Sequence, residues 1–110
     1  MGIYKYSYRF NAMHNTSGSA SGKHTHCFEV VFYLRQQMKF FYETENQVNC
    51  YMSKYMGAYL NDVLPVTPTI ENLAETIFCE INGLCEDFDV IRLELSDSPV
   101  QTYIVGVEEV

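Results

Sequence analysis

The sequence predicts an α+β fold, and the prediction rests on the order in which two kinds of hydrophobic pattern follow one another. Apolar and polar residues alternate near the start and near the end of the chain, which is typical of strands with one buried face. Between these stretches, apolar residues recur at steps of three and four, the spacing of amphipathic helices. The expected order is therefore two or three strands, two helices and two further strands.

Two long strands are expected first. From Ile3 to His14 the even positions are aromatic or apolar up to the final histidine, and most odd positions are polar. A loop rich in Ser and Gly follows over residues 15–22. The stretch from His24 to Leu34 alternates again and predicts a second strand, and a shorter third strand is expected from Met38 to Tyr42.

The middle of the chain predicts two helices. The first is expected from about Thr44 to Leu64, where Val, Tyr, Met and Leu residues line one face. Pro65 and Pro68 break the chain, and Thr69 is the expected N-cap of the second helix, whose apolar face extends to Leu84. Strands from Val90 to Leu95 and from Thr102 to Val107 complete the pattern.

Size and composition predict one folded domain over residues 1–110. A chain of 110 residues with 47% hydrophobic and 15% aromatic residues is typical of an ordered globular domain. Nine tyrosines and seven phenylalanines are many for a domain of this size, and both residue types are enriched in subunit interfaces. The composition therefore favours a homo-oligomer.

The charge and the hydrophobic pattern argue against two classes of partner. Seven basic and fourteen acidic residues give a net charge of -7, which disfavours binding to nucleic acid phosphates. No apolar run approaches the roughly 18 residues of a membrane span, and no secretory signal pattern opens the chain. We therefore expect a cytoplasmic protein without a membrane partner.

The only three histidines form the strongest candidate site. His24 and His26 lie two residues apart in the second strand, so their side chains point to the same face. In an antiparallel hairpin, His14 at the end of the first strand lies opposite the start of the second. Catalytic zinc sites commonly use three protein ligands, and all-histidine sets are among them. An isolated His-x-His pair is more often a pair of polar residues without a metal, but the placement of His14 favours a metal-binding site. Zinc is the most favoured ion.

Several motifs carry a resemblance to a known family. They are Phe10-Asn11-Ala12-Met13-His14, His24-Thr25-His26-Cys27-Phe28, Leu60-Asn61, Pro68-Thr69-Ile70-Glu71-Asn72, and Glu94 followed by Tyr103. In this order and spacing the chain resembles the 6-pyruvoyl-tetrahydropterin synthase and 6-carboxytetrahydropterin synthase family over nearly its whole length.

The resemblance implies a tunnelling fold, in which two helices cover one face of an antiparallel four-stranded sheet. Sheets of such proteins join into a barrel within trimers, and two trimers commonly form a hexamer. It also implies that Zn²⁺ on His14, His24 and His26 acts as a Lewis acid on a pterin such as dihydroneopterin triphosphate. Glu94 matches the family's pterin-anchoring carboxylate, and Thr69 and Glu71 match a substrate-binding segment.

The departures from the family concern proton transfer. Family enzymes commonly carry a cysteine base in the loop before the His-x-His pair, yet residues 15–23 contain neither cysteine nor glutamate. The family's Asp-His pair ahead of Leu-Asn is replaced by Met56 and Gly57. Ser17, Ser19 and Ser21 are poor unassisted bases, and Cys27 should point to the strand's opposite face. The catalytic residues thus stay unassigned.

Three functions remain open from the sequence. The first is a zinc-dependent lyase or synthase acting on a pterin, in a queuosine-, biopterin- or folate-type role. The second is an inactive relative that binds metal and a pterin or purine without turnover. The third is a structural oligomer in which the metal only stabilises the hairpin by linking its two strands.

Overall fold

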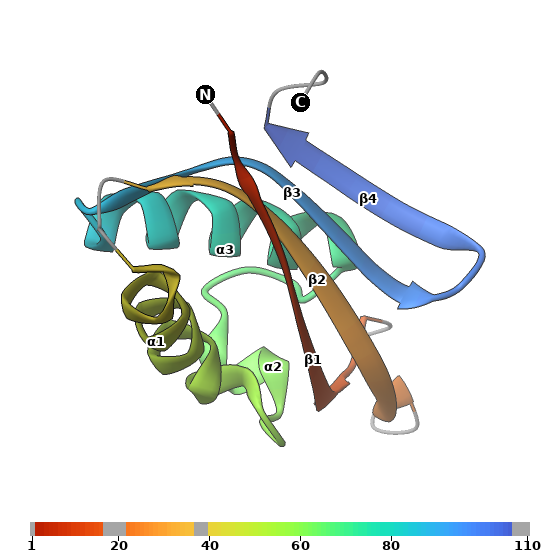
Figure 1. Ribbon diagram of the computed structural model, residues 1–110. Helices are drawn as coiled ribbons and strands as arrows, with labels where there is room; N and C mark the ends of the chain where they lie inside the picture. Colours follow the sequence, from red (N-terminus) through yellow and green to blue (C-terminus); the bar gives the residue numbers. More distant parts are fainter. Residues whose placement is uncertain (1, 17–21, 37–39, 107–110) are drawn as a thin grey trace.

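A four-stranded antiparallel sheet with helices on one face forms the fold (Figure 1). The computed structural model describes residues 2–16, 22–36 and 40–106. The strands lie side by side in chain order, as β1 (Tyr4–His14), β2 (His24–Gln36), β3 (Phe88–Ser98) and β4 (Gln101–Gly106). Between β2 and β3 come α1 (Phe41–Met52), the 3-10 helix η2 (Ser53–Tyr55), α2 (Leu60–Val63) and α3 (Ile70–Leu84). The predicted α+β class is confirmed.

The pairing of β1 with β2 determines which side chains face the helices. The two strands pair from Tyr4 opposite Leu34 to His14 opposite His24 without a register shift. Even-numbered side chains of both strands therefore share one face. The core confirms this alternation, because Phe10, Phe28 and Phe32 are at most 2% exposed, whereas the odd-numbered neighbours form the open face of the sheet.

Helix α3 follows the prediction closely. It spans Ile70–Leu84 and buries Leu73, Ala74, Ile77 and Ile81 on its inner face. The Thr69 side chain accepts a hydrogen bond of 3.1 Å from the backbone N–H of Asn72, so the predicted N-cap is confirmed. Among the described helices, none has the length and apolar character needed to cross a membrane.

The prediction of one helix from Thr44 to Leu64 is wrong. Helix α1 ends at Met52, η2 follows, and Gly57 then takes a left-handed conformation with φ of 69°. The Gly57 N–H donates to the Asn11 carbonyl at 2.6 Å, and the Met13 N–H donates to the Ala58 carbonyl at 2.8 Å. Strand β1 is an edge strand, so the backbone groups of Asn11 and Met13 that face away from β2 need hydrogen-bond partners. The segment around Gly57 supplies these partners instead of continuing the helix.

The predicted strand from Met38 to Tyr42 is also wrong in its second half. Phe41 and Tyr42 begin helix α1, while residues 37–39 lie outside the described part of the chain. Val107, the end of the last predicted strand, lies outside the described part as well. The aromatic residues that suggested a strand pack against β1 from a helix instead, since the rings of Tyr4 and Phe41 stack with centroids 4.2 Å apart.

Gly57 and Gly83 offer a matched pair of substitutions. Gly57→Ala should destabilise the protein by about 1–2 kcal/mol, because a Cβ is strained in the left-handed conformation. Gly83→Ala should be neutral or stabilising by up to about 1 kcal/mol, because Gly83 lies in helix α3 with open space around it. Urea unfolding measures both, and equal effects of the two changes would contradict this interpretation.

Candidate metal centre

The three histidines converge at the end of the β1–β2 hairpin. The potential ligand nitrogens of His14, His24 and His26 all lie within 4.8 Å of one another. Their ring centroids are 4.4, 5.0 and 4.6 Å apart, and Phe28 lies beneath two of the rings. Each ring approaches its neighbours edge-on, which leaves the nitrogens directed into a common space. The cluster predicted from the sequence is therefore formed and could hold a metal ion.

Backbone carbonyls orient two of these rings. His14 Nδ1 lies 2.8 Å from the Pro68 carbonyl oxygen, and His24 Nδ1 lies 2.7 Å from the Gly22 carbonyl oxygen. A carbonyl oxygen can only accept, so in each pair the Nδ1–H donates and the neutral ring keeps its lone pair on Nε2. Histidines that bind metal are typically oriented in this way by a hydrogen bond from their other nitrogen.

His14 provides an independent indication that a ligand belongs here. His14 is 5% exposed, yet its Nε2 has no hydrogen-bond partner among the described residues. A buried nitrogen without a partner costs free energy, on the order of 1–3 kcal/mol. A metal ion bound by Nε2 of His14 and of His24, together with a ring nitrogen of His26, would remove that cost, so the donor set fits a divalent ion such as zinc.

Asp97 is a site residue that the sequence did not reveal. Burial lowers the pKa of His26, the negative charge of Asp97 opposes this shift, and His14 and His24 reinforce it. Asp97 in β3 thus lies near enough to His26 for its charge to act on that ring, although it lies 71 residues later in the chain. The one feature of the sequence that could have drawn attention to Asp97 is its place directly before Ser98-Pro99, but an acidic residue at such a place is equally typical of a turn.

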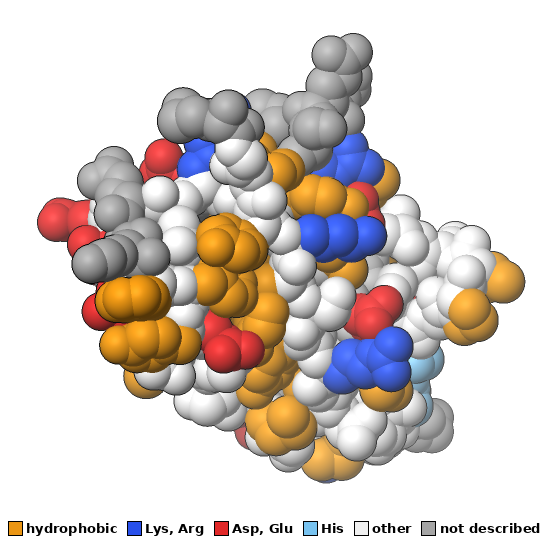
Figure 2. Space-filling view, in the orientation of Figure 1, with side chains coloured by type: hydrophobic (Ala, Val, Ile, Leu, Met, Phe, Trp, Pro, Cys, Tyr) orange, Lys and Arg blue, Asp and Glu red, His pale blue; other side chains and the backbone are white. Residues whose placement is uncertain are grey.

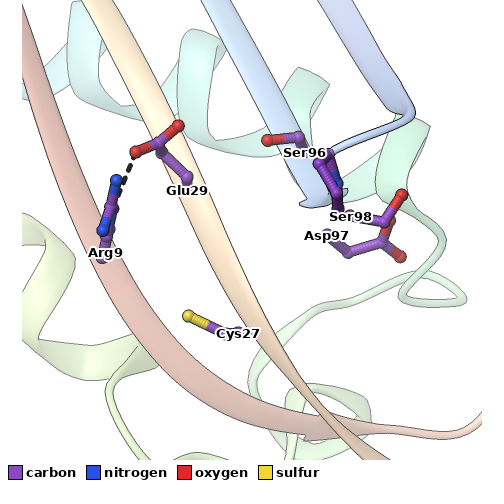
Figure 3. A pocket seen from close by; sticks show the side chains of 7 residues that line it. Arg9, Cys27, Glu29, Ser96, Asp97 and Ser98 are labelled. Atoms are coloured by element: carbon purple, nitrogen blue, oxygen red, sulfur yellow. Dashed lines mark hydrogen bonds and ion pairs between the residues drawn. The ribbon is translucent and has the colours of Figure 1, made fainter.

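A pocket lies on the open face of the sheet, which is the face opposite to the histidines (Figure 3). Its volume is about 320 Å³, and it is lined by Arg9, Cys27, Glu29, Ser96, Asp97, Ser98 and Pro99. The ladder between β2 and β3 ends at Glu29 opposite Ser96, although β2 begins five residues earlier at His24. The two strands therefore diverge where the pocket lies. Cys27 faces this pocket, away from the histidines, as the alternation predicted.

The structure does not bring Glu94 to the histidines within one chain. Glu94 pairs with Val31 and lies on the open face, where Lys, Arg, Asp and Glu side chains mix across the middle of the view in Figure 2. Its Oε2 accepts hydrogen bonds from Tyr33 at 3.1 Å and from Arg92 at 3.0 Å. The role of Glu94 as a pterin anchor stays a prediction.

Thr69 and Glu71 lie at the start of α3, beside the site but not in it. The Thr69 hydroxyl is engaged as the helix N-cap, and the preceding residue, Pro68, orients His14. Glu71 is exposed and lines a small hollow with Tyr103. Their substrate-binding roles stay predictions as well.

The positions expected to transfer protons hold groups without acid or base chemistry. Met56 is exposed, and Gly57 uses its backbone N–H to pair with β1. Ser17, Ser19 and Ser21 lie outside the described residues. Asp97 is near enough to His26 for its charge to act on that ring, whereas Cys27 faces away from the histidines.

The fold and the histidine cluster together define an α+β protein with three histidines at the end of a β-hairpin that could hold a metal ion. The family model for 6-pyruvoyl tetrahydropterin synthase matches residues 3–108, so the chain belongs to this family. A crystal structure of an uncharacterized protein from Wolinella succinogenes has the same fold, with a TM-score of 0.68 and 13% sequence identity. The match covers 98% of this chain and 100% of that one. No curated protein matches the chain.

Zinc binding should depend on the histidines and not on the neighbouring thiol. His24→Ala should weaken zinc binding by at least about 100-fold, because a three-ligand site loses one ligand. Cys27→Ala is the matched control and should bind zinc like the unaltered protein, because this side chain faces the opposite side of β2. Competition with a chromophoric chelator measures both affinities, and the reverse order would exclude the three-histidine site.

Proposed function

We propose that the chain is a zinc-dependent pterin-processing protein, acting on dihydroneopterin triphosphate or a related pterin. The observation that carries the proposal is the buried, partnerless Nε2 of His14 beside His24 and His26 in a member of the tetrahydropterin synthase family. In this proposal the three histidines hold Zn²⁺, which would supply Lewis-acid polarisation of substrate oxygens when bound. The residues of the chain orient the ligands and shape the site around them.

The orientation of the ligands is the chain's main contribution to this chemistry. Pro68 and Gly22 fix the tautomers of His14 and His24, so these rings need little rearrangement when an ion enters. Phe28 forms an apolar floor under His14 and His26. A preformed ligand set of this kind favours chemistry on a substrate that reaches the ion from the open side of the site.

The proposal includes assembly into a trimer or hexamer through closure of the sheets into a barrel. Strands β1 and β4 form the two edges of the sheet, and the segment around Gly57 pairs with β1 at Asn11 and Met13, near its C-terminal end. Exposed aromatic and aliphatic side chains near these edges support an interface, namely Tyr4, Phe40, Tyr42 and Ile104. Unpaired edges and exposed apolar groups favour association between copies.

A second candidate is an inactive relative that binds metal and a pterin or purine. Replacement of the family's Asp-His pair by Met56 and Gly57 favours this second candidate, because neither side chain can accept or donate a proton during the reaction. Loss of a general base typically costs a factor of about 10²–10⁴ in rate. Binding would survive this loss, since the histidines are intact.

Turnover distinguishes the two candidates. The zinc-loaded protein incubated with dihydroneopterin triphosphate should form a pterin product at a rate about 10²–10⁴ below that of an enzyme with its base intact. The variant carrying both His24→Ala and His26→Ala is the control and should show no turnover. Pterin binding without turnover above this control would favour the inactive relative, and absence of pterin binding would contradict both candidates.

A further inference from the structure

We propose that Asn61 and Asn72 are positioning residues of the metal centre. Their side-chain amides hold the two stretches of backbone that meet at His14, the most buried of the three histidines. Neither side chain belongs to the ligand set, and each acts on His14 through backbone groups. The inference rests on the proposed function, because it takes the three histidines as zinc ligands and adds the residues that set how tightly they bind.

Asn61 fixes the backbone directly after His14. Its Oδ1 accepts from the Asn15 N–H at 2.8 Å, and its Nδ2 donates to the Asn15 carbonyl at 2.9 Å. The ladder between β1 and β2 ends at His14, so Asn15 lies beyond the pairs that hold the strand. On the other side of His14, the Met13 N–H donates to the Ala58 carbonyl. The segment that leads into α2 therefore anchors both chain neighbours of His14.

Asn72 fixes the turn whose carbonyl orients the ring. Its Nδ2 donates to the Thr67 carbonyl at 2.9 Å. Thr67 and Pro68 share one peptide plane, and the proline ring holds φ of Pro68 at about −65°. A fixed Thr67 carbonyl thus leaves the Pro68 carbonyl little freedom. The Pro68 carbonyl in turn accepts from Nδ1–H of His14 at 2.8 Å.

The expected size of the effect follows from the distance of the two amides from the ligand. Groups that hydrogen-bond directly to a metal-binding histidine typically change metal affinity by about 10–100-fold when they are removed. Asn61 and Asn72 act one step further out, through the backbone. Loss of either side chain should therefore weaken zinc binding by a smaller factor, about 3–10-fold.

Asn82 offers a matched control elsewhere in the fold. Like Asn61, it exchanges two hydrogen bonds with the backbone of one residue, since its Oδ1 accepts from the Val90 N–H at 2.8 Å and its Nδ2 donates to the Val90 carbonyl at 3.0 Å. Val90 lies opposite Leu34, at the other end of β2 from His24. Loss of this pair should weaken the fold without an effect on the metal ligands.

Zinc affinity and stability, measured on the same three variants, test the inference. Asn61→Ala and Asn72→Ala should each weaken zinc binding about 3–10-fold in competition with a chromophoric chelator, whereas Asn82→Ala should bind zinc like the unaltered protein. Urea unfolding of the zinc-free proteins should give midpoints lowered to a similar extent in Asn61→Ala and Asn82→Ala. Loss of stability alone then does not account for the weaker zinc binding.

The tautomer of His14 gives a second readout, which needs no metal. At about pH 8 the imidazoles are neutral, and the nitrogen that carries the proton is set by the hydrogen bond that it makes. Nitrogen-15 NMR of the zinc-free protein should show the Nδ1–H form for His14 and for His24. Asn72→Ala should shift His14 toward the Nε2–H form and leave His24 unchanged, because its partner is the Gly22 carbonyl.

The outcomes separate the inference from the proposed function. Unchanged zinc affinity in both Asn61→Ala and Asn72→Ala, or an equal loss in Asn82→Ala, would overturn the inference while leaving the proposed function standing. If Asn61→Ala does not fold, the zinc affinity of Asn72→Ala and its His14 tautomer decide the question, and the absence of both effects would overturn the inference. Absence of zinc binding by the unaltered protein would instead contradict the proposed function.

Discussion

The pairing of β1 with β2 is the constraint on which the rest of the structure depends. Because side chains alternate along a strand, the register from Tyr4 opposite Leu34 to His14 opposite His24 assigns every residue of the hairpin to one face. The same alternation buries Phe10, Phe28 and Phe32 under the helices and carries the three histidines onto the helix side of the sheet. A shift of one residue would expose the core and separate His14 from His24. Formation of the hairpin in this register therefore also brings the three histidines together.

The helical layer contributes to the site through its backbone. The turn that starts α3 presents the Pro68 carbonyl to His14, and the Thr69 side chain caps the helix one residue later. Asn61 in α2 exchanges two hydrogen bonds with the backbone of Asn15, directly after His14, at 2.8 and 2.9 Å. These contacts fix the end of β1 from two sides. The orientation of His14 thus depends on the turn before α3, which lies far away in the sequence.

The elements with one strong periodic pattern were predictable from the sequence. Strands β1 and β2, helix α3 and the convergence of the histidines follow from local alternation and from hairpin geometry. The break at Gly57 was not, because the residues on both sides keep helical spacing and the competing partner is the edge of β1. Asp97 was missed for a similar reason. Its position depends on where β2 and β3 diverge, and no local pattern encodes that point.

The central claim is that three histidine nitrogens hold a zinc ion at the mouth of the hairpin. X-ray absorption spectroscopy at the zinc edge of the loaded protein measures the ligand atoms directly. The structure predicts a first shell of light atoms only, with three imidazole nitrogens at about 2.0–2.1 Å and their outer-ring scattering. Sulfur at about 2.3 Å, or scattering from fewer than three imidazoles, would contradict the account.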